Sequence, residues 1–287
     1  MAYAIDVQNL SKAYPGFRLK NISFSVPYGL CCGFVGPNGA GKTTTFKAML
    51  GMIRKESGEI RLLNKPDGDL SVKEELGVML DQPYFQEDWT PLDVENGVKP
   101  FYRGWDGSVY RQYLSRFELD PRKKFKELSR GMKMKLAMAV NLSHEAKLLL
   151  LDEPTGGLDP VARDEILDIM REYMVKDERT ILYSTHITSD LERIADMILY
   201  ISNGALSFCG EKDELTSKHC VVRGGKLPQE KRKSAIGLRE HGNGFECLME
   251  IGEIGGLPPD AITERATIDD VIVYMERRSK HAKHDEA

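Results

Sequence analysis

The chain has 287 residues, of which 41% are hydrophobic and 29% are charged, and its formal net charge is −4. This length and composition predict one large domain, or one domain with an appendage, around a full hydrophobic core. The acidic balance argues against a surface that binds nucleic-acid phosphates. We expect neither a membrane span nor a signal peptide, because no apolar run is long enough and the N-terminus lacks a basic segment followed by an apolar one.

The first segments alternate apolar and polar residues, as β-strands do. The predicted strands cover residues 4–7, 18–26 and 30–35, with a turn at 14–16. Cys31 and Cys32 are neighbours in the third strand, which is apolar throughout. We expect them to be reduced packing residues that point to opposite faces of a sheet.

A phosphate-binding loop follows this third strand. The segment fits G-x-x-x-x-G-K-[ST] and leads into a helix predicted over residues 44–50. Its glycines let backbone N–H groups point at a phosphate, its lysine adds a positive charge, and its threonine hydroxyl suits Mg²⁺. The alternative is a chance glycine-rich turn, and the flanking strand and helix argue against it. The predicted nucleotide contacts are Gly36, Pro37, Asn38, Gly39, Ala40, Gly41, Lys42, Thr43 and Thr44.

Strands and helices alternate along the rest of the chain, which is typical of an α/β fold. Apolar runs predict strands over residues 58–63, 77–80, 148–151 and 179–184. Helical periodicity predicts helices from residue 93 onward and over 108–117, 131–142, 164–174 and 189–195. Residues 197–202 and 205–209 flank Asn203-Gly204, which predicts a hairpin.

The character of the sequence changes after about residue 215. Residues 218–239 contain many Lys, Arg and Gly with little periodicity. We therefore expect a main domain over 1–215, with a helical part at about 83–146, and a small accessory region over 216–287. The basic stretch within this region could be a regulatory or lipid-facing patch, but a solvated surface loop is the favoured interpretation.

Asp152 and Glu153 end the leucine run. A carboxylate at the end of a buried strand beside a phosphate loop can support the Mg²⁺ shell, and the next carboxylate could polarise an attacking water. Taken alone, the pair could equally be two surface acids. The neighbouring segments favour catalysis, and these are Leu128-Ser129-Arg130-Gly131-Met132 and Pro154-Thr155-Gly156-Gly157-Leu158-Asp159.

With these segments the chain resembles the nucleotide-binding subunit of an ATP-binding-cassette (ABC) transporter, over residues 4–215. The elements that carry the resemblance are Tyr14, the phosphate loop, Gln82, the signature at 128–132, the leucine run with Asp152-Glu153, Leu158-Asp159, and His186. The resemblance implies a P-loop ATPase core with a mixed sheet and an N-terminal antiparallel β subdomain. An α-helical subdomain and the small C-terminal appendage complete the expected fold.

The resemblance also implies a role for each residue. Tyr14 would stack on adenine, with a plain turn tyrosine as the alternative. Glu153 would act as the general base, and His186 would hydrogen-bond the γ-phosphate. Gln82 would sense the metal and the attacking water. The residues around Mg²⁺ would be Thr43, Gln82 and Asp152, so that the implied cofactors are ATP and Mg²⁺ and the implied reaction is ATP hydrolysis.

The signature implies a second ATPase subunit. Ser129 and Gly131 lie at the start of a predicted helix, where a hydroxyl and free N–H groups form an anion site. In the family, the signature of one subunit closes on the ATP held by another, so that hydrolysis needs a homodimer or heterodimer. Asp159 would pass signals across that interface, and ATP would act as the switch that closes it.

The chain departs from the usual family pattern at two places. The signature commonly reads Leu-Ser-Gly-Gly-Gln, whereas here Arg130 and Met132 take the third and fifth positions. Gly156 and Gly157 stand where bulkier residues are common. Since the phosphate-contacting serine and glycine of the signature are kept, we expect function to survive.

The implied partner is a separate transmembrane permease, and the pattern looks like that of bacterial export-type cassettes. The chain would then be cytoplasmic and peripheral on the inner face of the membrane. Residues 83–89 interleave aromatics with acids, which suits docking of a permease helix. Tyr84 and Phe85 are the docking candidates, and packing within the helical part is the equal alternative. The transported substrate is not encoded here.

A soluble ABC-type ATPase that acts on ribosomes or nucleic acid is the competing function. The single cassette, the absence of a coiled-coil heptad run and the net charge of −4 all argue against it. A small-molecule kinase would leave the signature and His186 without a role. We therefore expect no nucleic-acid partner.

Overall fold

The computed structural model describes residues 2–81, 83, 85–176, 178–242 and 244–285. Its centre is a six-stranded mixed sheet with the order β10-β9-β3-β8-β7-β6, in which only the β9–β10 pair is antiparallel. The strands are β3 (Cys31–Val35), β6 (Leu76–Met79), β7 (Leu148–Asp152), β8 (Thr180–Thr185), β9 (Met197–Ser202) and β10 (Ala205–Glu211). Because the central strands run parallel, their carboxyl ends meet at one edge of the sheet.

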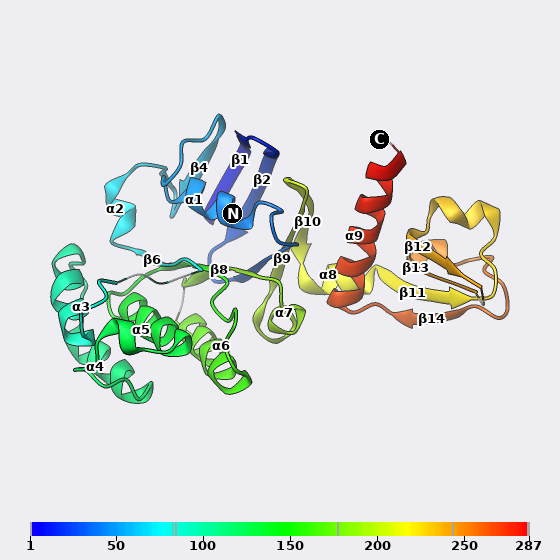
Figure 1. Ribbon diagram of the computed structural model, residues 1–287. Helices are drawn as coiled ribbons and strands as arrows, with labels where there is room; N and C mark the ends of the chain where they lie inside the picture. Colours follow the sequence, from blue (N-terminus) through cyan, green and yellow to red (C-terminus); the bar gives the residue numbers. More distant parts are fainter. Residues whose placement is uncertain (1, 82, 84, 177, 243, 286–287) are drawn as a thin grey trace.

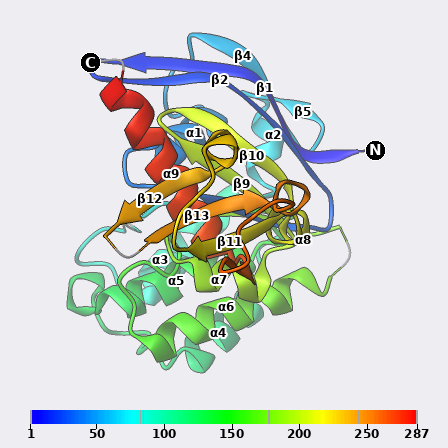
Figure 2. The ribbon, with the colours of Figure 1, turned by 90° about the vertical axis from the view of Figure 1, so that its right-hand side faces the viewer.

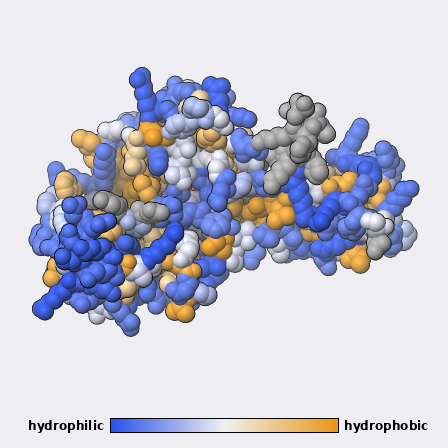
Figure 3. All heavy atoms as spheres, viewed as in Figure 1, coloured by the Kyte–Doolittle hydropathy of each residue, from blue (hydrophilic) through white to orange (hydrophobic). Residues whose placement is uncertain are grey.

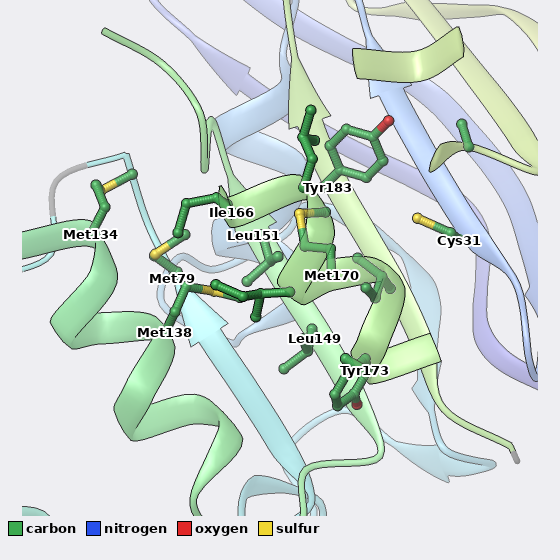
Figure 4. Close-up of a cluster of buried hydrophobic side chains, with 14 of the residues drawn as sticks. Cys31, Met79, Met134, Met138, Leu149, Leu151, Ile166, Met170, Tyr173 and Tyr183 are labelled. Carbon is green, nitrogen blue, oxygen red and sulfur yellow. The ribbon is translucent and has the colours of Figure 1, made fainter. Parts of the chain in front are cut away.

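The two faces of this sheet are covered by different layers (Figure 1). Cys32 belongs to the core shared with the N-terminal antiparallel sheet, whereas Cys31 belongs to the core shared with the helices. The prediction that these neighbours face opposite sides is therefore confirmed. Leu149 and Leu151 lie in the helical core, where Figure 4 shows them among methionines and aromatic rings.

The N-terminal layer is a four-stranded antiparallel sheet with the order β2-β1-β4-β5. Its strands are β1 (Tyr3–Tyr14), β2 (Phe17–Pro27), β4 (Ser57–Leu62) and β5 (Lys65–Pro66), and α1 (Lys42–Met49) lies between this layer and the central sheet. The predicted α/β class with an antiparallel β subdomain is confirmed.

Helices cover the other face, and most begin at a side-chain cap. Thr90, Asp106, Ser129 and Asp159 each accept hydrogen bonds from backbone N–H groups of the following turn. The helices of this layer are α3 (Pro91–Val98), α4 (Gly107–Arg116), α5 (Arg130–Leu142), α6 (Pro160–Met174) and α7 (Thr188–Ile194). The short helices α2 (Leu70–Lys73), η1 (Lys99–Phe101) and η2 (Phe125–Glu127) lie in the connections. None of the described helices is long and apolar enough to cross a membrane.

A third sheet, with the order β12-β13-β11-β14, lies beyond α8 (Lys212–Ser217). Its strands are β11 (His219–Gly224), β12 (Ile236–His241), β13 (Gly244–Glu250) and β14 (Ile262–Arg265), with η3 (Gln229–Lys233) and η4 (Ile251–Glu253) between them. The expected surface loop over 218–233 is wrong for its first part, because β11 is an inner strand of this sheet. Val221 packs toward the main core and Val222 packs into a separate small core, so both faces of β11 are covered.

Helix α9 (Ile268–Asp285) lies between the third sheet and the rest of the chain (Figures 1 and 2). The Tyr200 hydroxyl donates a hydrogen bond of 2.7 Å to Glu276, and the Thr188 hydroxyl donates one of 3.2 Å to Asp269. Val271 belongs to the same hydrophobic cluster as the helices under the central sheet. The third sheet is thus attached through a shared core as well as through the chain.

Candidate active site

The phosphate loop connects β3 to α1 at the carboxyl edge of the central sheet. A Cβ at Gly36 would lie 2.1 Å from the carbonyl oxygen of Ile201, so no side chain fits between the loop and β9. Lys42 is 6% exposed, and its Nζ donates to the carbonyl oxygens of Gly36 at 2.6 Å and Pro37 at 3.4 Å. The loop is therefore wrapped around its own lysine.

Thr43, in the first turn of α1, meets the end of β7. Its hydroxyl donates to one oxygen of Asp152 at 2.7 Å, while the Ser184 hydroxyl donates to the other oxygen. Asp152 is fully buried, so these two bonds fix its carboxylate. The hydroxyl of Thr43 and the carboxylate of Asp152 are the hard oxygen ligands that Mg²⁺ prefers in proteins.

Glu153 directly follows the buried strand β7, and its carboxylate lies near His186 and Lys42. One of its oxygens lies 2.8 Å from His186 Nδ1, and the other lies 3.7 Å from Lys42 Nζ. Its backbone has a φ of 53°, and its N–H donates to the Ser184 hydroxyl at 2.9 Å. A non-glycine residue in this left-handed region costs free energy, and such residues cluster at functional sites.

Lys42, Thr43, Glu153 and His186 line an open cleft of about 660 Å³, and the buried Asp152 lies behind Thr43. Most of the nucleotide-contacting residues predicted from the phosphate loop lie on its wall together with Glu153 and His186. Those from the loop and α1 are Pro37, Asn38, Gly39, Gly41, Lys42, Thr43 and Thr44. Gln82 lies outside the described residues. The structure thus brings together residues that are far apart in the sequence and that had been assigned separate roles.

Tyr14 lies beside a second hollow, of about 750 Å³, on the outer side of the loop. Ala40 and Asn203 also line it. The Tyr14 ring is 42% exposed, and Lys12 Nζ lies 5.1 Å from its centroid. An exposed ring at this position is free to stack on a planar ligand.

Phe17 was missed by the sequence reasoning. It lines both the cleft and the second hollow, and a Cβ at Gly41 would lie 3.0 Å from the end of its ring. The only sequence signal is an aromatic residue three positions after Tyr14, at the start of a strand. An apolar strand residue gives the same signal.

The signature lies at the start of α5. The Ser129 hydroxyl accepts the Met132 N–H at 3.2 Å, which caps the helix. A Cβ at Gly131 would lie 3.8 Å from the Cβ of Ala162, so α5 and α6 begin close together. Asp159 caps α6, and the hydrogen bonds from the N–H groups of Ala162 and then Val161 lower its pKa. Ser129, Gly131 and Asp159 are not among the described residues that line the cleft.

Within the aromatic segment before α3, Phe85 is packed against the helical part. Phe85 packs edge-on against Phe125, with ring centroids 5.6 Å apart. For Phe85 the packing alternative is therefore the one that the structure supports. Tyr84 lies outside the described residues.

Comparison with known proteins gives consistent matches. The family model described as "ABC transporter" matches residues 19–156. The chain is 34% identical over 222 residues to the uncharacterized ABC transporter ATP-binding protein YxlF of Bacillus subtilis, which covers 74% of this chain and 72% of that protein. It is 35% identical over 211 residues to the Nod factor export ATP-binding protein I of Burkholderia orbicola, which covers 70% and 68%. A solved structure described as an ATP binding subunit of an ABC transporter has a TM-score of 0.67 at 28% identity, covering 74% of this chain and 91% of that one.

Proposed function

The chain belongs to the ABC transporter family as an ATP-binding, ATP-hydrolysing subunit, and we propose that it uses Mg-ATP to drive export through a separate permease. The observation that carries this proposal is the meeting of Lys42, Glu153 and His186 beside the phosphate loop. Export is favoured by the similarity to a Nod factor export protein, and the chain would lie on the cytoplasmic face of the membrane. The transported substrate is set by the permease.

The residues in and beside the cleft have different roles in ATP hydrolysis. Lys42 and the loop N–H groups bind phosphate oxygens, and Thr43 with Asp152 would hold Mg²⁺, which offsets the charge on the phosphates. Glu153 accepts the proton of the attacking water. Its carboxylate is suited to this task because contacts to His186 and Lys42, one at each oxygen, fix its orientation at the wall of the cleft.

The signature serves a second subunit rather than this chain's own nucleotide. Ser129, Gly131 and Asp159 lie at the adjoining starts of α5 and α6, outside the lining of the cleft. Two long helices that begin side by side present partly positive N-terminal ends to the same region. ATP held by the phosphate loop of a partner subunit would bind there, and this chain's own ATP would bind the partner's signature in the same way. Both nucleotides would then lie between the subunits, so ATP binding would favour the closed dimer.

We propose a different permease contact from the one expected at residues 83–89. A hollow of about 310 Å³ lies between the end of α1, α2 and β6, and Met49, Leu62, Val72, Leu76 and Tyr102 are among its lining residues. Leu70 is 71% exposed next to it and Phe101 is 73% exposed, and Figure 3 shows apolar spheres in the region of α2. The lining also includes Asp67, Asp69 and Lys73, and this mixture of apolar and charged side chains fits a short amphipathic permease helix. Residues 216–287 would form an accessory region that α9 holds against the cassette.

The test of this function is Glu153→Gln in the full-length chain. The substitution keeps the shape of the side chain and removes the base, so kcat should fall at least about a hundredfold while Mg-ATP still binds. With Mg-ATP, the variant should elute as a dimer in size-exclusion chromatography. Glu59→Gln, at an exposed glutamate of β4, is the control and should behave as wild type.

Two results would contradict the proposal. Normal hydrolysis by Glu153→Gln would remove the base assignment. Recovery of the chain only on ribosomes or DNA, and never with a membrane protein after mild detergent extraction, would replace transport by the competing function.

A further inference from the structure

Arg130 takes the third signature position, where the usual pattern has glycine, and its side chain lines the cleft. Its Nη2 lies 3.2 Å from an oxygen of Asp81, the residue just before Gln82. Both side chains are about half exposed and both line the cleft. The pair therefore connects the end of β6 to the start of α5.

The same guanidinium also covers the turn that follows Glu153. A Cβ at Gly157 would lie 3.2 Å from Arg130 Cζ, 3.3 Å from Nη1 and 3.4 Å from Nε. Three nearly equal distances mean that the planar group lies face-on against this glycine. Gly157 also has a φ of 70°, which strains any other residue. Two of the residues that depart from the family pattern, Arg130 and Gly157, thus lie against each other.

The position of Arg130 is electrostatically unfavourable for helix α5 itself. A cation at the first residue of a helix faces the positive end of the helix dipole. Its charge is offset by Asp81, which belongs to a different segment of the chain. The positive charge of Arg130 is therefore stabilised by the ion pair with Asp81 and not by its position in helix α5.

We propose that Arg130 is a positioning residue for ATP hydrolysis. It joins three segments that approach the nucleotide, which are the end of β6 at Asp81, the start of α5, and the turn at Gly157. It forms part of the wall of the same cleft that the phosphate loop lines. This inference rests on the ATPase activity of the chain, and it gives Arg130 a role in its own subunit that the signature serine and glycine do not share.

The proposal predicts which kinetic constant changes. Nucleotide is bound mainly by the phosphate loop and Lys42, whereas the contacts described for Arg130 are to Asp81 and Gly157. Loss of the arginine should therefore lower kcat and leave the affinity for ATP unchanged. Because half-exposed ion pairs are weak, the expected decrease in kcat is about fivefold.

The test is a double-mutant cycle on the full-length chain, with ATPase rates and the Kd of a fluorescent ATP analogue as readouts. Arg130→Ala and Asp81→Ala should each lower kcat about fivefold, and the double variant should lose no more than either single one. Arg171→Ala is the matched control, because Arg171 pairs with Asp168 on α6 at 2.9 Å and at similar exposure.

Additive effects of the two single variants would overturn the role of Arg130. An unchanged kcat in Arg130→Ala would overturn it as well. These outcomes are separate from a failure of the proposed function, because Glu153→Gln tests hydrolysis itself. A loss of ATP affinity together with kcat would show a general structural defect and would also count against positioning.

Discussion

Protonation of His144 should weaken the helical part of the molecule in mild acid. His144 follows α5, is 2% exposed, and stacks on Tyr102 with ring centroids 3.8 Å apart. Burial lowers the pKa of His144 from 6.5 to about 4. The unfolded chain therefore takes up this proton at a higher pH than the folded chain does.

The sign and the size of the effect follow from linkage. Since the unfolded state binds the proton more tightly, stability falls as the pH drops below 6.5 and stops falling near 4. Between pH 7.5 and pH 4.5 the loss from this residue alone is about 2.5 kcal/mol. A change of this size is a large fraction of the total stability of a typical domain.

Urea unfolding followed by tryptophan fluorescence measures this effect. The chain has 2 tryptophans, Trp89 and Trp105, and both lie beside the helices, where Trp105 packs on Tyr110. The variant His144→Phe keeps an aromatic ring and has no proton to bind, so it should lose about 2.5 kcal/mol less than wild type between the two pH values. An exposed histidine substituted in the same way, His241→Phe, should follow wild type. Equal losses in wild type and His144→Phe would refute the reasoning.

Two further predictions concern the surface and the loop. The double variant Leu70→Glu with Phe101→Glu should lower transport and co-purification with the permease at least tenfold. ATP binding by the full-length chain should be unchanged. Normal co-purification would rule out this contact. Gly36→Ala should abolish measurable ATP binding, because its methyl group would lie about 2.1 Å from the backbone of Ile201. Binding of a fluorescent ATP analogue at wild-type affinity would contradict this prediction.

The sequence predicts the central sheet well because its strands are buried on both sides. Leu148–Leu151 and the Cys31–Cys32 pair have no polar interruption, so the apolar runs locate the strands, and strand geometry puts neighbouring residues on opposite faces. β11 was missed for the opposite reason. Its apolar core is only three residues long, Cys220 to Val222, and charged residues on both sides conceal it. Its partners β13 and β14 are formed by later parts of the chain.

In the site, too, features formed by one continuous segment can be predicted from the sequence, whereas contacts between distant segments cannot. The phosphate loop is one continuous segment, and a pattern of residues is enough to recognise it. The link between Arg130 and Asp81 joins residues 49 positions apart, and nothing near either residue predicts it. The packing of Phe85 on Phe125 likewise depends on how two segments fold back on each other.

The place of β3 in the central sheet has a consequence for biosynthesis. β3 carries the phosphate loop, yet its neighbours on either side are β8 and β9, which end at Thr185 and Ser202. A ribosome therefore makes the loop early but releases the strands that hold it only after most of the chain has emerged. The β1–β2 hairpin can form long before this, whereas the ATP site cannot. Nascent chains that stop before Ser202 should be folding intermediates that ATP does not stabilise.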